Sequence, residues 1–470
     1  MPGRRNEDCG LSGGREPYRR DRGDCIVGLK KTAFCLLALM PSTALAASPE
    51  IDTGDTSWML VSTALVLMMT IPGLALFYGG MVRKKNVLAT VMQSFAICCL
   101  MSVVWMMAGY SLAFGTGNAW IGDLNRFFLN GIGEHISKGT DVGFTLGAGS
   151  GHETVMTIPE SIFMMFQMTF AIITPALIAG AFAERMKFAA MMVFSLLWSL
   201  IVYAPIAHWV WSPLGWLAGL GAVDFAGGTV VHINAGVAGL VAALVMGKRH
   251  GYGRDDLAPF NLTYAVIGAS LLWVGWFGFN AGSAVGANGR AGMAMATTQI
   301  AAGSAGISWM VVEWLKAGKP TVLGIISGAV AGLVAITPAA GFVLPGGALL
   351  IGLIAGAVCY FTATILKHIL GYDDSLDAFG VHGVGGIVGA LLTGVFAYGP
   401  LSATDSDPVG VTGSLHQVLV QAEACAVTIV WCAVLTFILL KLVDMTIGLR
   451  VSHAEEVEGL DITLHGERIG

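Results

Sequence analysis

The 470-residue sequence has few charged side chains: Asp, Glu, Lys and Arg make up 12% of it, against about 25% in soluble domains. So few charges cannot cover the surface of a soluble protein of this length. The net charge of −5, with no basic cluster in the body of the chain, argues against nucleic acid as a partner. The eight cysteines lack metal-type spacing, and no C-x-x-C-H haem motif occurs. No Ser/His/Asp or Cys/His set with catalytic spacing is present either, so we expect neither an enzyme nor a bound metal or cofactor.

Long apolar runs occupy most of the sequence. Hydrophobic residues make up 55% of the chain and glycine occupies 64 positions, a composition that suits closely packed membrane helices. Runs of about 20 apolar residues, long enough to cross a bilayer, recur with short interruptions. We therefore predict an all-α polytopic membrane protein with eleven transmembrane helices. They are expected near residues 57–81, 87–114, 158–183, 188–207, 226–247, 262–283, 292–315, 321–342, 346–366, 379–398 and 416–447.

Basic residues are distributed unevenly between these spans. The odd-numbered connections hold eleven Lys and Arg residues, whereas the even-numbered ones hold three, although they include the longest loop. Cytoplasmic loops of membrane proteins are rich in Lys and Arg. The odd connections and the C terminus are therefore predicted to be cytoplasmic, and the mature N terminus external.

The N terminus has the features of a targeting segment. Lys30 and Lys31 precede an apolar run at 32–40 and a small-residue cleavage site ending at Ala46, the order found in a secretory signal peptide. We therefore expect an N-terminal extension and signal peptide at 1–46, an eleven-helix domain at 47–447 and a cytoplasmic tail at 448–470. The predicted location is the cell (inner) membrane.

A pattern in the fifth span recurs in the tenth. Asp224 precedes His232, Asp377 precedes His382, and each histidine is followed by glycine four and seven positions later. Because the two spans are five apart, the halves that contain them cross the membrane in opposite directions. The pattern predicts an inverted repeat of helices 1–5 and 6–10 with an eleventh helix left over, and such repeats commonly place the substrate path between the halves.

His232 and His382 are the two histidines that lie well inside predicted spans. A single buried histidine is more often a packed imidazole than a functional group. Two at symmetry-related depths favour a functional pair, because polar groups in hydrocarbon are costly. Asp224, at the outer start of its span, is expected to cap the helix and can also attract a cation. Trp211 is placed in the external connection before it.

Aromatic residues share helix faces in two other spans. Phe166 and Phe170 are four positions apart, and Trp276, Phe279 and Ser283 follow at spacings of three and four. An aromatic stripe of this kind is more often part of a core or an interfacial belt than of a binding site. The spacing by itself leaves both interpretations open.

Several longer motifs make the sequence similar to a known family, from about Thr56 to Asp461. The motifs are Ala75-Leu-Phe-Tyr78-Gly-Gly80, Asp224-Phe-Ala-Gly-Gly-Thr-Val-Val-His232-Ile-Asn234, Gly275-Trp276-Phe-Gly-Phe279-Asn280-Ala-Gly-Ser283 and Phe379-Gly-Val-His382-Gly. Through them the chain resembles the ammonium transporter (Amt) family, on the microbial/plant branch of the ammonium/methylammonium permease/Rhesus superfamily. Rhesus-type proteins generally lack the Trp211 and Ser283 equivalents present here.

The resemblance implies a role for each candidate residue, carried over position by position. It implies an outer site that binds ammonium, a gate beneath it, and a pore lined by two histidines. It also implies a buried carboxylate tied to deprotonation or to shaping the outer site. The corresponding residues are Trp211, Phe166 and Ser283 for binding, Phe170 and Phe279 for the gate, His232 and His382 for the pore, Asp224 for the carboxylate, and Trp276 and Tyr78 as further pore candidates.

The resemblance further implies the partners of the chain. The substrate would be ammonium or ammonia, with methylammonium as an analogue, and the assembly a homotrimer with one pore per subunit in membrane lipid. The segment from Gly448 through Glu458-Gly-Leu-Asp461 to His465 resembles the family's cytoplasmic tail. That tail implies docking of a trimeric PII-type protein of nitrogen signalling at the cytoplasmic face.

Energetics favour ammonia over ammonium as the species that crosses. A bare cation in hydrocarbon costs tens of kcal/mol, and each aromatic ring returns only about 0.5–2 kcal/mol. Removing a proton from an amine with a pKa of about 10 costs about 4 kcal/mol at neutral pH. We therefore expect ammonium to bind, to lose its proton at the constriction, and ammonia to pass two neutral imidazoles.

Two other functions fit parts of the pattern. An ammonium sensor or receptor with little flux would share the outer site, and radiolabelled methylammonium uptake separates it from a transporter. A redox subunit with His232 and His382 as axial haem ligands is disfavoured, because haem bundles usually present more histidines. An absorption spectrum of the purified protein tests that alternative.

Overall fold

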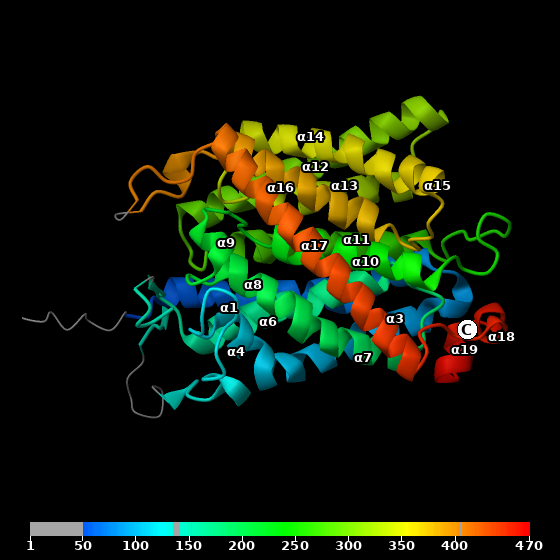
Figure 1. Cartoon of the computed structure of the whole chain (residues 1–470). Helices are drawn as coiled ribbons and strands as arrows, with labels where there is room; N and C mark the ends of the chain where they lie inside the picture. Colours follow the sequence, from blue (N-terminus) through cyan, green and yellow to red (C-terminus); the bar gives the residue numbers. More distant parts are fainter. Residues whose placement is uncertain (1–49, 135–141, 152, 405–406) are drawn as a thin grey trace, which may run out of the picture. The chain divides into compact units, whose positions relative to one another are not determined.

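The computed structural model describes residues 50–134, 142–151, 153–404 and 407–470. The expected signal peptide at 1–46 lies outside these residues. The described residues are mostly helical (Figure 1), and their one paired sheet is a short antiparallel hairpin of β1 (Thr145–Leu146) and β2 (Thr154–Val155). The predicted all-α membrane architecture is confirmed.

The first half of the chain folds into helices over all five predicted spans. The label η marks π-helical turns within these spans and 3-10 turns in the connections, and the π-helical turn η1 contains a kink at Ile71, whose backbone is not helical. The segments are α1 (Thr53–Met68), η1 (Met69–Leu74) and α2 (Ala75–Met81); α3 (Val87–Val104), η3 (Trp105–Gly109) and α4 (Tyr110–Phe114); α6 (Glu160–Ala179); α7 (Phe188–Trp198), η5 (Ser199–Tyr203) and α8 (Ala204–Trp211); and η6 (Gly228–Ile233) with α10 (Asn234–Met246).

The second half repeats this pattern and adds the last long helix. Its segments are α11 (Leu262–Gly282); α12 (Gly289–Ala317); α13 (Val322–Ile336); α14 (Pro345–Tyr360), η7 (Phe361–Leu366) and α15 (Lys367–Leu370); η8 (Phe379–Gly383) with α16 (Val384–Phe396); and α17 (Leu415–Thr446). Short elements in the connections and the tail are η2 (Lys84–Asn86), η4 (Phe127–Leu129), α9 (Trp216–Gly219), η9 (Gly399–Leu401), α18 (His453–Glu458) and α19 (Leu460–His465).

Nine helical segments of the described chain are long and apolar enough to cross a membrane. The two remaining predicted spans are also helical. α12 has 29 residues but is less apolar than the others, and α13 is apolar but has only 15 residues. Every predicted span therefore overlaps a helix, while the count of eleven crossings stays a prediction.

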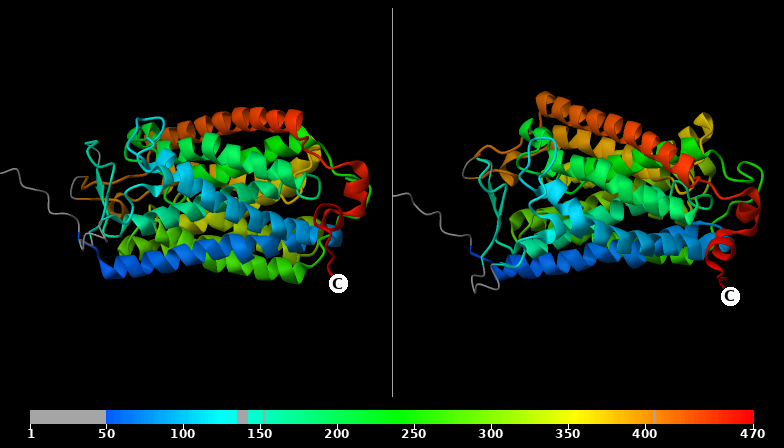
Figure 2. Two further views of the ribbon diagram at one scale, coloured as in Figure 1. Left: turned by 90° about the horizontal axis from the view of Figure 1, so that it is seen from below. Right: turned by 60° about the horizontal axis from the view of Figure 1, so that its bottom comes forward.

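The long helices lie side by side along one direction of the bundle, and α17 crosses the others obliquely (Figure 1). The β1–β2 hairpin lies at one end of the bundle, and α18 and α19 lie at the other, as the two turned views also show (Figure 2). We call these the hairpin end and the tail end.

Close packing at glycine joins the two helices that carry the predicted histidine pair. A Cβ atom on Gly236, in α10, would collide with the backbone of Gly383, at the end of η8. Only glycine lets two helix backbones approach this closely. The contact brings η6 and η8, and with them His232 and His382, to the same place in the bundle.

Buried charges tie the tail-end connections together. The carboxylate of Glu184 pairs with Arg83 at 2.8 Å and with Arg249 at 3.2 Å, and Arg249 also pairs with Asp373 at 2.9 Å. Burial by itself would raise the pKa of Glu184, but Arg249 and Arg83 outweigh it and hold that pKa below its ordinary value. The pKa of Asp373 is lowered in the same way, chiefly by Arg249 against the effect of burial.

The C-terminal segment pairs with the same connection through its backbone. The amide of Lys187 donates to Leu449 O at 2.9 Å, and the amide of Val451 donates to Arg185 O at 3.1 Å. Further along, Asp461 accepts a hydrogen bond from the amide of Ala89 at 2.8 Å. The tail is therefore an ordered part of this end of the bundle.

Candidate functional site

A pocket of about 250 Å³ opens at the hairpin end, and we call it the aromatic pocket. Its walls come from α4, the hairpin, α6, the α8–α9 connection and the end of α11. The lining residues are Phe114, Leu146, Thr154, Met156, Phe163, Phe166, Gln167, Phe170, Trp211, Ser212, Pro213, Ala218, Phe225, Ser283 and Val285. The three residues predicted to bind ammonium, Phe166, Trp211 and Ser283, thus line one pocket.

Two residues with polar acceptor atoms, Ser283 and Gln167, are among those that line this pocket. The Ser283 hydroxyl donates to Phe279 O at 2.8 Å, so its lone pairs stay free to accept a hydrogen bond. The Gln167 side-chain oxygen is buried and has no hydrogen-bond partner among the described residues. Sequence reasoning missed Gln167, although its position beside Phe166 on α6 could have indicated it. Aromatic faces with two neutral acceptors suit a small cation that carries N–H donors.

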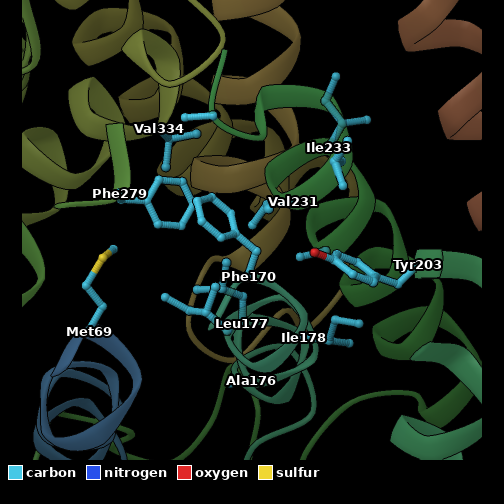
Figure 3. Close-up of a cluster of buried hydrophobic side chains, with 14 of the residues drawn as sticks. Met69, Phe170, Ala176, Leu177, Ile178, Tyr203, Val231, Ile233, Phe279 and Val334 are labelled. Atoms are coloured by element: carbon cyan, nitrogen blue, oxygen red, sulfur yellow. The ribbon is translucent and has the colours of Figure 1, made fainter. Parts of the chain in front are cut away.

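Two phenylalanines close the inner end of the aromatic pocket. Phe170 lines the pocket, whereas Phe279 does not and is fully buried behind it. Their ring centroids are 4.3 Å apart with the planes inclined by 36°. Figure 3 shows the two rings side by side, one from α6 and the other from α11. The two residues predicted to form the gate therefore meet at the inner side of the aromatic pocket.

The two predicted pore histidines lie directly beyond this pair. The His232 ring centroid is 6.0 Å from that of Phe279 and 5.3 Å from that of His382, with both pairs nearly parallel. The two Nδ1 atoms are 3.3 Å apart. His232 Nε2 is buried and has no described partner. No described carboxylate bonds to either ring, so the pair fits two neutral imidazoles that share one N–H.

Trp276 holds His232 in place. The two rings stack with centroids 5.4 Å apart and planes inclined by 24°. The Trp276 indole N–H donates to Thr337 Oγ1 at 2.9 Å, which fixes the indole. Tyr78 is different: its hydroxyl donates to Leu177 O at 3.1 Å, and Phe77 is its one ring neighbour among the described residues. Of the two further pore candidates, the structure brings only Trp276 to the histidines.

Asp224 caps the helix that carries His232. Its two carboxylate oxygens accept hydrogen bonds of 2.6–3.1 Å from four successive backbone amides. These are orphan donors of a helix start, and an anion there is further stabilised by the helix dipole. The carboxylate does not line the aromatic pocket, but Asp224 O accepts from the Trp211 indole at 2.9 Å. Asp224 therefore shapes the pocket through Trp211. The amides belong to Gly227, Gly228, Thr229 and Val230.

The structure corrects two details of the sequence interpretation. Trp211 is the last residue of α8 rather than part of a connection, because the helix continues past the apolar run that ended the predicted span. The counterpart of Asp224 in the second half is Asp374, not Asp377. Asp374 accepts from the amides of Ala378 and Phe379 at 3.1 and 2.8 Å, and it lies eight residues before its histidine, as Asp224 does.

Asp377 differs from Asp374 in its bonding partner and in its backbone conformation. It pairs with Lys367, and its φ of 60° lies in the left-handed region. Its neighbour Asp374 is buried, and burial together with the nearby Asp377 raises the pKa of Asp374. The repeat is thus built on two capping carboxylates, one at each end of the bundle.

Comparison with known proteins decides the family. The sequence profile described as the Ammonium Transporter Family matches residues 57–469. The chain belongs to the ammonium transporter family. This is a family of membrane transporters, and the resemblance found in the sequence motifs is confirmed.

Relatives from the ammonium transporter family match this chain over nearly its whole length. It is 49% identical over 433 residues to the ammonium transporter of Aquifex aeolicus, covering 92% of this chain and 97% of that protein. It is 50% identical over 417 residues to the ammonium transporter of Bacillus subtilis, covering 88% and 98%. Multi-pass membrane architecture is common to the family.

Solved structures are similar to this chain as well. The crystal structure of Saccharomyces cerevisiae Mep2 is 38% identical, with a TM-score of 0.77 over 86% of this chain and 89% of that one. A structure titled Sensor Amt Protein is 29% identical, with a TM-score of 0.76 over 88% of this chain and 98% of that one.

Proposed function

We propose that ammonium binds in the aromatic pocket of this transporter, that it releases a proton to water on the outer side of the Phe170–Phe279 pair, and that ammonia then passes His232 and His382. One observation carries the proposal. The pocket, the phenylalanine pair and the histidine pair form an unbroken series of ring contacts, each step 4.3–6.0 Å between centroids. Along this series, the lining changes from ring faces with hydrogen-bond acceptors, to two phenylalanine rings without polar atoms, and then to two imidazoles.

This order suits an ion that binds and a neutral molecule that passes. The ring faces of Phe166 and Trp211, with the free lone pairs of Ser283 and Gln167, hold a cation with N–H donors. The Phe170–Phe279 contact offers ring faces but no polar atom, so a charged species gains only about 0.5–2 kcal/mol per ring there, far less than its desolvation costs. The unpartnered Nε2 of His232 then gives ammonia a hydrogen-bond partner.

Uptake by purified protein tests the proposal. Proteoliposomes that contain the transporter should accumulate radiolabelled methylammonium and should give a response to an ammonium pulse, whereas empty liposomes should not. Potassium at equal concentration should neither be transported nor compete, because the pocket has no ring of carbonyls or carboxylates. Absence of methylammonium uptake from folded protein would contradict transport.

The remaining expectations are part of the same proposal. The chain would consist of a signal peptide within 1–46, a transporter domain at 47–447 and a tail at 448–470. The hairpin end would face outward from the cell (inner) membrane, with the tail end in the cytoplasm. Three subunits would assemble in lipid, and a PII-type protein would dock on the tail end. Crosslinking in the membrane and protease access to the tail test the assembly and the orientation.

A second candidate function is sensing of ammonium. One of the similar solved structures is titled a sensor, and an aromatic pocket that binds ammonium serves a receptor equally well. A receptor would bind methylammonium without net uptake. The proteoliposome measurement therefore separates the two functions directly.

A further inference from the structure

Arg290 lies beside the aromatic pocket, between two aromatic rings and without a carboxylate partner among the described residues. It is in the first turn of α12 and is partly buried. Its guanidinium carbon is 4.9 Å from the Phe225 ring centroid and 4.5 Å from that of Phe342. Its Nε donates to Gly341 O at 2.9 Å.

Two rules of protein electrostatics are broken at this position. The guanidinium has no ion pair with any carboxylate of the described residues, in contrast to Arg249 and Arg83 at the tail end. It also stands at the N-terminus of a 29-residue helix, where the dipole repels cations. Residues that break local rules without electrostatic compensation are concentrated at functional sites.

Phe225 connects this charge to the aromatic pocket. Phe225 lines the pocket, whereas Arg290 does not. The Phe225 ring meets Phe342 edge to face at 5.9 Å, and its backbone amide donates to Pro338 O at 3.1 Å. A Cβ atom on Gly341 would collide with the Phe225 ring, so the ring fills its space completely. The Phe225 ring is therefore held in one position in the pocket wall, and the positively charged guanidinium of Arg290 lies against it.

A fixed positive charge beside a cation site weakens cation binding. The guanidinium repels ammonium through a medium of low dielectric constant. It also interacts with the π system of Phe225, which leaves that ring less able to attract a second cation. Aromatic pockets without such a charge would hold ammonium more tightly and release it more slowly.

We propose that Arg290 is a positioning residue that sets the affinity of the aromatic pocket: its guanidinium fixes Phe225 and lowers the affinity for ammonium. The inference rests on the proposed function of the pocket. Arg290 does not line the aromatic pocket, so it would act on ammonium binding through Phe225.

Methylammonium uptake into proteoliposomes tests this with three variants. Arg290→Met removes the charge and keeps a long side chain between the two rings, and it should lower the KM about three- to tenfold. Arg290→Lys keeps the charge and should hold the KM within about twofold of the wild type. Arg254→Met, which changes an exposed arginine at the tail end, should leave the KM unchanged.

The direction of the change distinguishes the outcomes. A merely structural role for Arg290 predicts a higher KM in Arg290→Met, because a loosened Phe225 binds less well. A KM that rises or does not move in Arg290→Met therefore overturns the inference. Wild-type protein that takes up no methylammonium contradicts the proposed function instead. Thermal unfolding in detergent identifies any variant that fails to fold. A fourth variant, Phe342→Leu, loosens the ring contacts of Arg290 but keeps its charge, so it should not lower the KM.

Discussion

His232 and His382 face each other through their Nδ1 atoms at 3.3 Å, although 150 residues separate them in the chain. Two nitrogens at this distance form a hydrogen bond only when one ring donates and the other accepts. The pair therefore fits two neutral rings better than two imidazolium ions, which would place two donors against each other. Neutral imidazoles suit the passage of an uncharged molecule.

Removing the histidine pair should abolish the main current. In a His232→Ala/His382→Ala variant we expect the response to a methylammonium pulse to fall at least about tenfold, because no other hydrogen-bond partner replaces the imidazoles. Solid-supported membrane currents on proteoliposomes measure this. His368→Ala changes an exposed histidine and should behave like the wild type. Full currents in the double variant would refute the role of the pair.

Loss of one aromatic face should weaken recruitment of the substrate. Trp211→Leu should raise the KM for methylammonium about 2- to 30-fold, which corresponds to a cation–π energy of about 0.5–2 kcal/mol. The maximal rate should change less, since the pore is intact. Trp314→Leu removes a tryptophan that is 55% exposed and is the matched control. An unchanged KM in Trp211→Leu would mean that this ring does not bind the ion.

Replacing Asp224 should lower the stability of the protein, and we expect loss of uptake to follow from this loss of stability rather than from a direct part in deprotonation. Asp224→Ala leaves four buried amides without an acceptor, at about 1–3 kcal/mol for each one that finds no other partner. We expect a lower unfolding temperature and loss of uptake together. Asp52→Ala removes an exposed cap of α1 and should cost only about 1 kcal/mol. Lost uptake with an unchanged unfolding temperature would instead favour a direct part for Asp224 in deprotonation.

The tail-end ion pairs should make stability depend on pH. The pKa values of Glu184 and Asp373 are lowered on folding, so their stabilisation is present above the ordinary carboxyl pKa of about 4 and is lost as pH falls through the lower folded values. Wild-type unfolding temperature, followed by fluorescence in detergent, should therefore be level near neutral pH and fall in strong acid.

Arg249→Met should change that profile in a defined way. Without Arg249, Glu184 keeps only Arg83 as an ionic partner among the described residues and Asp373 keeps only Arg185 at 3.7 Å, so burial offsets more of the remaining stabilisation and the pKa of each carboxylate rises. The buried charges are then less well compensated at neutral pH, at a cost of up to about 3–5 kcal/mol. Mild acid should partly restore the stability of this variant by neutralising them. If the variant has the wild-type profile, the pairs do not stabilise this end of the bundle.

The long helices and the two capping aspartates show which features can be predicted from the sequence. The apolar runs located every long helix, because hydrophobicity and helix length are properties of the local chain. The spacing of eight between Asp224 and His232 recurs between Asp374 and His382 and was open to sequence analysis. The sequence interpretation pairs Asp377 with His382, five residues apart, and does not use this equal spacing. Which aspartate caps the helix depends on which backbone amides lack a hydrogen-bond partner, and the sequence alone does not show this.

The sequence by itself determined the helices, the membrane class and the candidate residues, since each depends on neighbours within a few turns. Only the tertiary structure decided that Phe170 meets Phe279, that His232 meets His382 and that Arg290 lies against Phe225. These contacts join segments far apart in the chain, and the angles at which helices cross at glycine fix them. Crossing angles arise from the packing of whole helix faces, and no local pattern of residues encodes them.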